Sequence, residues 1–341
     1  MSGAFGWHGG SNRDRDYDRS SGYSSARSAY SQPVSPPRVK KIEPKKPAPK
    51  PDRQNTWQEA AKPLSSIPEA KHTLRSTAEN VAIIVTDLTG SMDEWPKEIF
   101  KRLPLMYAEV QKYLGQDLEF LFIAHHDAHS DNDHRKTNTT QVTRFGRGPE
   151  LDGLLASFGM AKGTGGGQGY ESHELVAYYL LHQVDTSTAK TVFCYFITDE
   201  RPFDTVESNL VRTELGLSGG DQSSKEVFRS LQQKMNVFSV LRRTTNYPLQ
   251  VKKIDQWWVD CLGQERVLRL NDHRRAVDVM LGAMAATIGQ KEVFTQDLQS
   301  RQGPTRHGTA NIHTVMQSIA FVGPTGPSTE PITNPTKGLL D

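Results

Sequence analysis

The stretch VAIIVTDLTGSMDE, residues 81–94, decides how the rest of the chain is interpreted. Its first half is a short run of β-branched and aliphatic residues, typical of a strand buried on both faces of a parallel sheet. That run ends at Asp87, and residues 95–114 follow with apolar side chains spaced three and four apart, as in an amphipathic helix. A buried strand, a polar loop and an amphipathic helix predict the first unit of an α/β domain.

The same alternation continues along the chain. Buried strands are expected over residues 118–124, 191–198, 237–241 and 267–270, with a short edge strand over residues 141–145. Helices are expected over residues 151–158, 172–181, 224–235 and 274–288. Alternating strands and helices predict a doubly wound, mostly parallel central sheet with helices on both faces. Ligands of such sheets bind at the carboxyl ends of strands, where Asp87 and Asp199 lie.

Composition divides the chain into three parts. Residues 1–76 are rich first in Gly, Ser and Arg and then in Pro and Lys, which predicts a disordered tail. We interpret its Pro/Lys segment as a spacer rather than an arm for an anionic partner. A single domain is expected over residues 77–295, followed by a Pro/Gly-rich tail over residues 296–341. An apolar patch at residues 312–322 is a candidate for packing back on the domain.

Charge and cysteine content bound the choice of partners and compartment. The formal net charge of +2 gives no electrostatic reason to expect nucleic acid or a membrane as a partner. Cys194 and Cys261 form no CxxC pair, so no thiolate zinc site is expected. The N-terminus has no apolar leader, and the longest aliphatic run is far below the roughly 20 residues of a membrane span. We therefore expect a cytoplasmic protein.

A carboxylate and two hydroxyls alternate directly after the first strand, at Asp87, Thr89 and Ser91. Alternate residues of an extended loop point the same way, so three hard oxygen donors face one point, as Mg²⁺ or Mn²⁺ requires. Ser91 and Glu94 also have the spacing of a helix capping box. The residues alone leave the metal site and the helix cap as alternatives.

Three segments carry a resemblance to a known family. VAIIVTDLTGSMDE resembles the metal-ion-dependent adhesion site of von Willebrand factor type A (vWA) domains, whose first motif is D-x-S-x-S, with Thr89 at the usual position of a serine. GTGGGQGYESHEL, residues 163–175, resembles the glycine-rich second loop of some bacterial and phage members. FCYFITDERPF, residues 193–203, is similar to the third strand and its aspartate. The resemblance covers residues 80–289 and implies that Asp199 contacts the metal through water.

The second loop departs from the usual family pattern, which supplies a threonine ligand. The candidates here are Thr164, Gln168, Glu171 and Ser172. Glu171 is preferred because a carboxylate at the start of a helix is favourable, although satisfying the free N–H groups there is also its alternative explanation. The predicted metal ligands are therefore Asp87, Thr89, Ser91, Glu171 and Asp199, with Thr164 and Asp127 as further candidates.

Two other motifs suggest different chemistry. HHDAHSDNDH, residues 125–134, contains ligand types of zinc and iron centres but lacks the helical spacing of HExxH. We interpret it as a polar loop with Asp127 near the main site and the other residues solvated. The glycine-rich loop has no GK[ST] and no preceding strand, which argues against phosphate binding. Trp257 and Trp258 are expected to pack in the core rather than form an interface.

The resemblance implies a metal-dependent protein-binding or scaffolding module, and not an enzyme. Its ion would capture an Asp or Glu carboxylate of a partner, for which an ATPase or kinase encoded nearby is a candidate because such relatives often occur beside them. Two alternatives remain from the residues: a metal-dependent hydrolase that uses a histidine of residues 125–134 as general base, and a structural assembly protein with an inactive metal site.

Overall fold

The computed structural model describes residues 73–92, 94–129, 140–158, 169–243 and 248–324. All of them belong to one compact unit, residues 52–341. Of the predicted N-terminal tail only residues 73–76 are described, and they include β1 (Leu74–Arg75), which pairs in parallel with β6 (Val184–Asp185). The folded part therefore begins slightly before the predicted boundary at residue 77.

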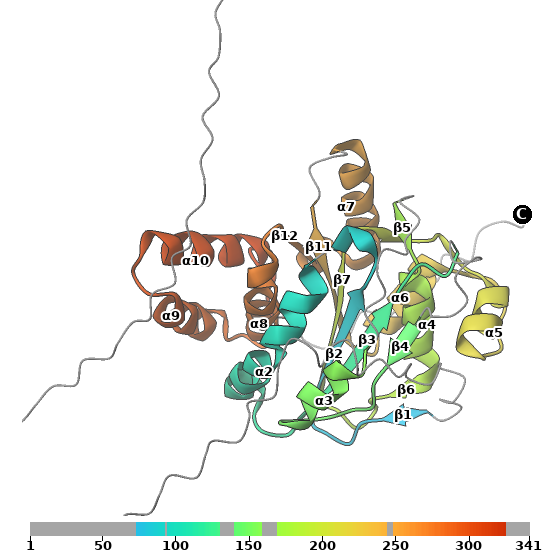
Figure 1. Cartoon of the computed structure of the whole chain (residues 1–341), viewed down its shortest axis with the longest axis horizontal. Coiled ribbons are helices and arrows are strands. Elements are labelled where there is room, and N and C mark those ends of the chain that lie inside the picture. The colour runs from blue at the N-terminus through green and yellow to red at the C-terminus, as the bar shows by residue number, and fades with distance from the viewer. Residues whose placement is uncertain (1–72, 93, 130–139, 159–168, 244–247, 325–341) are drawn as a thin grey trace, which may run out of the picture. The chain divides into compact units, whose positions relative to one another are not determined.

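A six-stranded sheet with the order β12-β11-β7-β2-β3-β4 forms the centre (Figure 1). Every neighbouring pair is parallel except β3 with the edge strand β4. The strands are β2 (Asn80–Asp87), β3 (Leu118–His125), β4 (Thr140–Val142), β7 (Thr191–Thr198), β11 (Asn236–Arg242) and β12 (Val267–Leu270). This is the predicted doubly wound, mostly parallel sheet.

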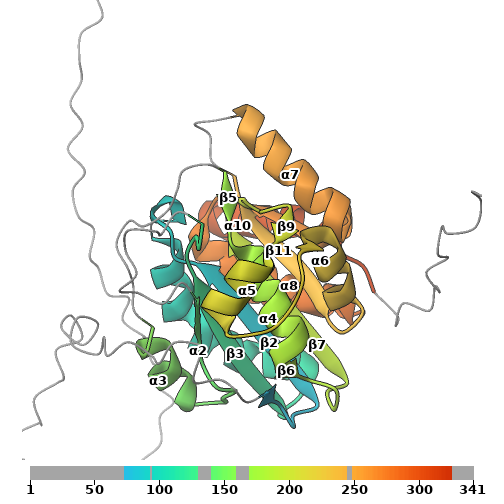
Figure 2. The same ribbon diagram turned by 90° about the vertical axis from the view of Figure 1, so that its right-hand side faces the viewer.

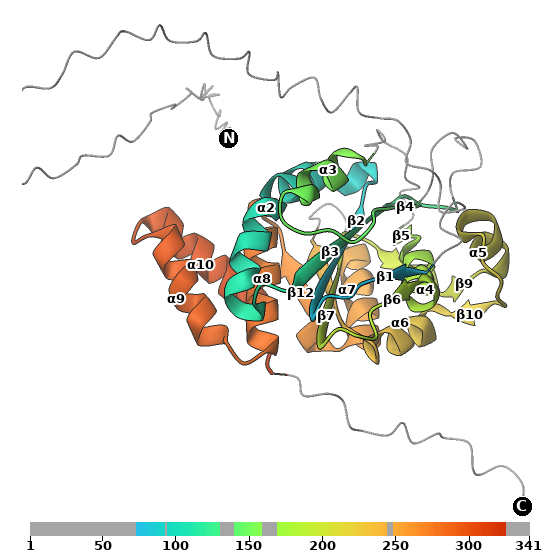
Figure 3. The ribbon, with the colours of Figure 1, turned by 90° about the horizontal axis from the view of Figure 1, so that it is seen from below.

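Strand β2 shows why both faces of the sheet are covered. Val81, Ile83 and Val85 belong to one hydrophobic core, whereas Ala82 and Ile84 belong to the other. Successive side chains of a strand point to opposite faces, so an all-apolar strand needs a helical layer on each side. The two layers lie on either side of the strands in Figure 3, and Figure 2 looks onto the layer that contains α4 and α6.

The helices divide between the two cores by their buried residues. The first layer contains α2 (Trp95–Leu114), α3 (Glu150–Ala156), α8 (Ala276–Thr287), α9 (Lys291–Gln302) and α10 (Arg306–Ser318). The second layer contains α4 (His173–Gln183), α5 (Ser208–Leu215), α6 (Ser224–Gln232) and α7 (Pro248–Leu262). No helix in the described ranges has the length and apolar run needed to cross a membrane.

Each strand and helix expected from the sequence is present, and α2 and β12 have the predicted bounds. Trp258 is fully buried and Trp257 is nearly so, which confirms the prediction of core packing. Helices α5 and α7 were not predicted. Helix α5 is short and buries only Val211 and Leu215, so its signal in the sequence is weak, whereas the apolar residues of α7 were interpreted only as core packing at Trp257 and Trp258.

The predicted C-terminal tail begins too early. Residues 296–341 were assigned to it, but α9 and α10 continue the fold as far as Ser318. In α9 only Phe294 and Leu298 are buried, so a single pair of apolar residues one turn apart carries its packing on α8. The apolar patch at residues 312–322 does pack on the domain, since Val315, Ile319 and Val322 lie in its core.

Candidate metal centre

The first predicted loop begins where β2 ends. Asp87 is the last residue of β2 and is paired across the sheet with His125, the last residue of β3. It is fully buried, and its Oδ1 accepts a 2.7 Å hydrogen bond from the backbone N–H of Thr89. Its other oxygen, Oδ2, has no hydrogen-bond partner among the described residues. One carboxylate oxygen therefore fixes the loop, and the other is left for a ligand.

The two hydroxyls of this loop lie together and connect to the third loop. Thr89 Oγ1 and Ser91 Oγ are 3.1 Å apart, and Ser91 Oγ donates a 2.9 Å hydrogen bond to Asp199 Oδ1. Helix α2 has Glu94 as its N-cap and no side-chain capping bond, so the capping-box alternative does not describe Ser91 here. Ser91 is exposed, which leaves this side of the loop open to solvent.

The second and third loops are joined by backbone pairing. The short strand β5 (Tyr170–Glu171) runs parallel to β8 (Arg201–Pro202), just beyond Asp199. Gly169 precedes β5 with φ of 83°, and a Cβ there would collide with the side chain of Gln250 at the start of α7. This turn needs a glycine, and it brings Glu171 into the centre with an exposed fraction of 1%. Thr164 and Gln168 lie outside the described residues.

Asp127 is held close to the second loop. Its Oδ1 accepts hydrogen bonds from the backbone N–H of His129 at 2.9 Å and from Ser172 Oγ at 3.3 Å. Ser172 Oγ in turn accepts from the backbone N–H of Ala128 at 2.8 Å. The negative charge of Asp127 helps to raise the pKa of Asp87 and of Glu171, so Asp127 lies near both carboxyl groups.

Burial raises the pKa values of four carboxyl groups in the centre, and repulsion between carboxylates adds to it for Asp87, Glu171 and Glu200. Burial is the largest cause for each of Asp87, Glu171, Asp199 and Glu200. The next cause is repulsion, from Asp199 for Asp87 and from Asp87 for Glu171. Glu200 reaches a pKa of about 8, with Asp199 as its strongest repelling neighbour. Arg242 provides an opposing charge: it lowers the pKa of Asp199 and donates a hydrogen bond to the carbonyl oxygen of Ser91.

The donor set fits a divalent cation. Asp87 Oδ2, Glu171 Oε2 and Glu200 Oε2 are buried without a hydrogen-bond partner in the described part of the chain, an arrangement that is costly without a compensating charge. No group of three His, Cys, Asp or Glu side chains that could hold a metal occurs in the same part. An ion here would therefore need the hydroxyls of Thr89 and Ser91 and water beside the carboxylates, which suits Mg²⁺ or Mn²⁺.

Sequence reasoning missed Glu200. It follows Asp199 directly at the end of β7 and is only 8% exposed, with one carboxylate oxygen unpaired. The signal was present as two consecutive acidic residues at a strand end. Adjacent residues of a strand point apart, however, so only the turn after β7 brings both carboxyls into one cluster.

The expectation for residues 125–134 is partly wrong. His125 and His126 are buried rather than solvated, because β3 continues through His125 at the covered end of the sheet. His125 Nε2 lies 2.9 Å from His173 Nδ1, so it is engaged inside the domain. His129 stacks on Phe203 with ring centroids 3.7 Å apart. Asp131, Asp133 and His134 lie outside the described residues.

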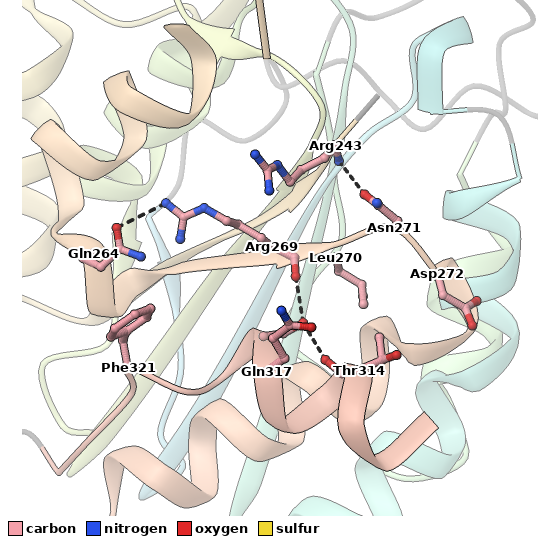
Figure 4. A pocket seen from close by; sticks show the side chains of 10 residues that line it. Arg243, Gln264, Arg269, Leu270, Asn271, Asp272, Thr314, Gln317 and Phe321 are labelled. Carbon is pink, nitrogen blue, oxygen red and sulfur yellow. Dashed lines mark hydrogen bonds between the residues drawn. The ribbon is translucent and has the colours of Figure 1, made fainter. Parts of the chain in front are cut away.

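A groove of about 590 Å³ lies beside β12 and α10, away from these loops (Figure 4). The guanidinium of Arg269 borders it and is bound to both carboxylate oxygens of Asp255, at 2.5 and 2.9 Å. Asp272 binds Arg274 in the same two-point manner, at 2.9 and 3.1 Å. The exposed Arg243 contributes its backbone N–H to Asn271. None of the predicted ligands lines this groove.

Comparison with known proteins finds matches among solved structures only. The sequence matches no family model and no curated protein. Two structures of the pilus adhesin SpaC from Lactobacillus rhamnosus GG are similar in fold at 14% identity, with TM-scores of 0.42 for an open conformation and 0.43 for a second form. Each match covers 66% of this chain, which spans only 31% and 32% of the adhesin chains. Likeness at this level says nothing about what the chain binds.

Proposed function

We propose that this chain is a metal-dependent protein-binding or scaffolding module of the vWA kind, in which a divalent cation captures a carboxylate of a partner protein. One observation carries the proposal: Ser91 of the first loop binds Asp199 of the third, beside a buried Asp87 oxygen that has no partner among the described residues. This contact supports the proposal, because the sequence resemblance implies that both loops contribute to one metal site.

The residues that would hold the ion are Asp87, Thr89 and Ser91, with Asp199 through water and Glu171 from the second loop. A bound cation supplies a positive centre to which an external Asp or Glu oxygen can bind. The chain's own residues fix the first loop through Asp87 Oδ1 and leave the exposed Ser91 side open. Glu171 and Glu200 add negative charge near the ion, so a partner carboxylate must compete with them.

The hydrolase alternative has less support. A histidine general base must reach a water near the ion, but His125 is fully buried and its Nε2 lies against His173. His129 is stacked on Phe203 and faces Glu174, with 3.7 Å between Nε2 and the carboxylate. The assembly alternative has an inactive metal site and predicts no saturable ion binding in the wild type, which the experiment below decides.

The test is calorimetric titration of Mg²⁺ and Mn²⁺ into the chelator-treated full chain and into Asp87→Ala, with Asp152→Ala as matched control because Asp152 is exposed. We expect saturable binding in the wild type and the control and none in Asp87→Ala. N-acetyl-aspartate amide, titrated next, should bind only when the ion is present. Binding of the ion that survives Asp87→Ala, or a carboxylate probe that ignores the ion, would contradict the proposal.

A further inference from the structure

A chain of buried hydrogen bonds runs behind the metal centre. His173 Nδ1 lies 2.9 Å from His125 Nε2, and His173 Nε2 lies 2.8 Å from Thr198 Oγ1. All three side chains are completely buried. We name these three residues the histidine brace. Phe196 and Trp258 pack around the ring of His173, with centroids 6.2 and 5.8 Å away, so water does not replace these bonds.

Each member of the brace lies at the end of a different element that borders the centre: His125 ends β3, His173 begins α4 and Thr198 ends β7. His125 is the sheet partner of Asp87, and its carbonyl oxygen accepts the backbone N–H of Leu88 at 3.0 Å. His173 stands two residues after Glu171, and Thr198 directly precedes Asp199. The brace therefore connects by side chains the end of β3, the start of α4 and the end of β7, and the first loop is joined to it through the backbone at His125.

Proton counting shows that His173 is the centre of the brace. Both rings are completely buried, and His173 contacts a second imidazole and a hydroxyl rather than a carboxylate, which favours the neutral form. A neutral imidazole has one N–H and one lone pair. Of its two bonds, His173 must therefore donate one and accept the other, and no single amide or hydroxyl at this position spans both partners.

Thr198 transmits the position of the brace to the third loop. Its Oγ1 accepts the backbone N–H of Glu200 at 2.9 Å and lies 3.3 Å from the carbonyl oxygen of the same residue. Trp258 Nε1 donates to that carbonyl oxygen at 3.0 Å. The backbone on both sides of Asp199 is thus fixed by hydrogen bonds to buried side chains, independently of any ligand.

We propose that His173 and Thr198 are positioning residues, which hold the three loops so that their oxygen donors meet at one cation. The inference rests on the proposed function and extends it. Mg²⁺ and Mn²⁺ demand a near-octahedral arrangement of oxygens, so a small displacement of one loop lowers affinity even when every ligand is present. The brace contacts no ligand oxygen of Asp87, Thr89 or Ser91 and acts only through the backbone.

The experiment compares two single hydroxyl deletions on the same strand. Thr198→Val removes the brace hydroxyl with little change of shape. Tyr195→Phe, also on β7, removes a buried hydroxyl on the opposite face of the sheet. That hydroxyl donates a 3.0 Å hydrogen bond to the carbonyl oxygen of Met280. Thr198→Ser keeps the hydroxyl and serves as the conservative variant. Mn²⁺ affinity is measured by calorimetry on the full chain, and thermal unfolding is measured without metal.

We expect Thr198→Val to weaken Mn²⁺ binding roughly 10- to 100-fold, the usual range for partners that orient metal ligands. Tyr195→Phe should lower the unfolding temperature without changing the affinity, and Thr198→Ser should bind as the wild type does. His173→Asn and His173→Gln, which each retain one of the two bonds, should give intermediate losses.

Unchanged affinity in Thr198→Val would overturn the inference, as would equal losses in Thr198→Val and Tyr195→Phe, because the effect would then be general destabilisation. In both cases the wild type still binds Mn²⁺ and the proposed function stands. A wild type that binds no ion removes the proposed function and the inference together.

Discussion

The metal centre and the groove beside β12 both gather charged side chains, but only the groove pairs them. There Arg269 holds Asp255 and Arg274 holds Asp272, each through two hydrogen bonds. The acidic side chains of the metal centre are Asp87, Asp127, Glu171, Asp199 and Glu200. None of them forms an ion pair with Lys or Arg in the described part of the chain. Paired charges need no ligand, whereas buried unpaired carboxylates do. The better candidate for binding an ion is therefore the centre.

The largest expected consequence of this difference is the pH dependence of stability without metal. Carboxyls with raised pKa stay protonated in the folded chain after they ionise in the unfolded chain, so the folded state loses stability as pH rises. Buried His125 and His173 act in the opposite sense, but only below their ordinary pKa of 6.5. Between pH 6.5 and 8 the carboxyls dominate, and we expect the free energy of unfolding to fall by roughly 2–4 kcal/mol.

Urea unfolding of the chelator-treated chain at several pH values measures this slope. The double variant Glu171→Gln, Glu200→Gln should flatten it, because amides do not titrate. A free energy of unfolding that rises over the same interval would show that positive charges already neutralise these carboxylates, as arginines do in the groove.

The next effect is stabilisation by the ion itself. At about 100 times the dissociation constant, a cation that binds only the folded state adds about 2.7 kcal/mol to the free energy of unfolding. Thermal unfolding with and without Mn²⁺ should show this gain for the wild type and for Asp152→Ala, and no gain for Asp87→Ala. A gain retained in Asp87→Ala would place the ion elsewhere.

Removing one unpaired carboxylate gives a smaller effect. Glu200→Gln keeps the size of a side chain that is 8% exposed and removes its charge. Without metal at pH 8 we expect the free energy of unfolding to rise by about 1–2 kcal/mol, because a charge is no longer buried and repulsion from Asp199 is relieved. Glu226→Gln, an exposed position on α6, is the control and should change nothing measurable. Loss of stability in Glu200→Gln would mean that the carboxylate is already compensated.

The fold was predictable because its main signals are local. Each long strand is an apolar run closed by a polar residue, and α2 has apolar residues at regular helical spacing. Helix α9 escaped prediction because its sequence is mostly polar and only Phe294 and Leu298 are buried. Its packing depends on the presence of α8 and α10, which no local pattern encodes.

The centre was predictable only where it follows strand ends. Asp87 and Asp199 were found because each closes an apolar run, and Thr89 and Ser91 because they alternate with Asp87. The brace was not found, since His173 meets residues 48 and 25 positions away in sequence. Such contacts depend on the order of strands in the sheet and on the rotation of α4, neither of which the spacing of histidines reveals.

The smallest expected effect comes from unpairing a charge in the groove. Asp255→Ala leaves Arg269 without its carboxylate, but the guanidinium keeps Gln264 and the carbonyl oxygen of Val267 as acceptors at 3.2 and 3.3 Å. Both side chains of the pair are about one-fifth exposed, so water replaces part of the lost interaction. We expect the free energy of unfolding to fall by about 1 kcal/mol. Asp260→Ala, on the exposed side of the same helix, should change it by less than about 0.5 kcal/mol.

Mn²⁺ titration of both variants completes the comparison. The affinity should match that of the wild type, because the groove and the centre share no ligand residue. If Asp255→Ala weakened Mn²⁺ binding as strongly as a change at Asp87, the two regions would be coupled. The connection would then have to run through the adjacent Arg242 and Arg243, since Arg242 reaches the carbonyl oxygen of Ser91 and Arg243 borders the groove. Unchanged affinity would instead show that the groove takes no part in ion binding. The carboxylates that need a cation would then be those without a hydrogen-bond partner in the described part of the chain, at Asp87, Glu171 and Glu200.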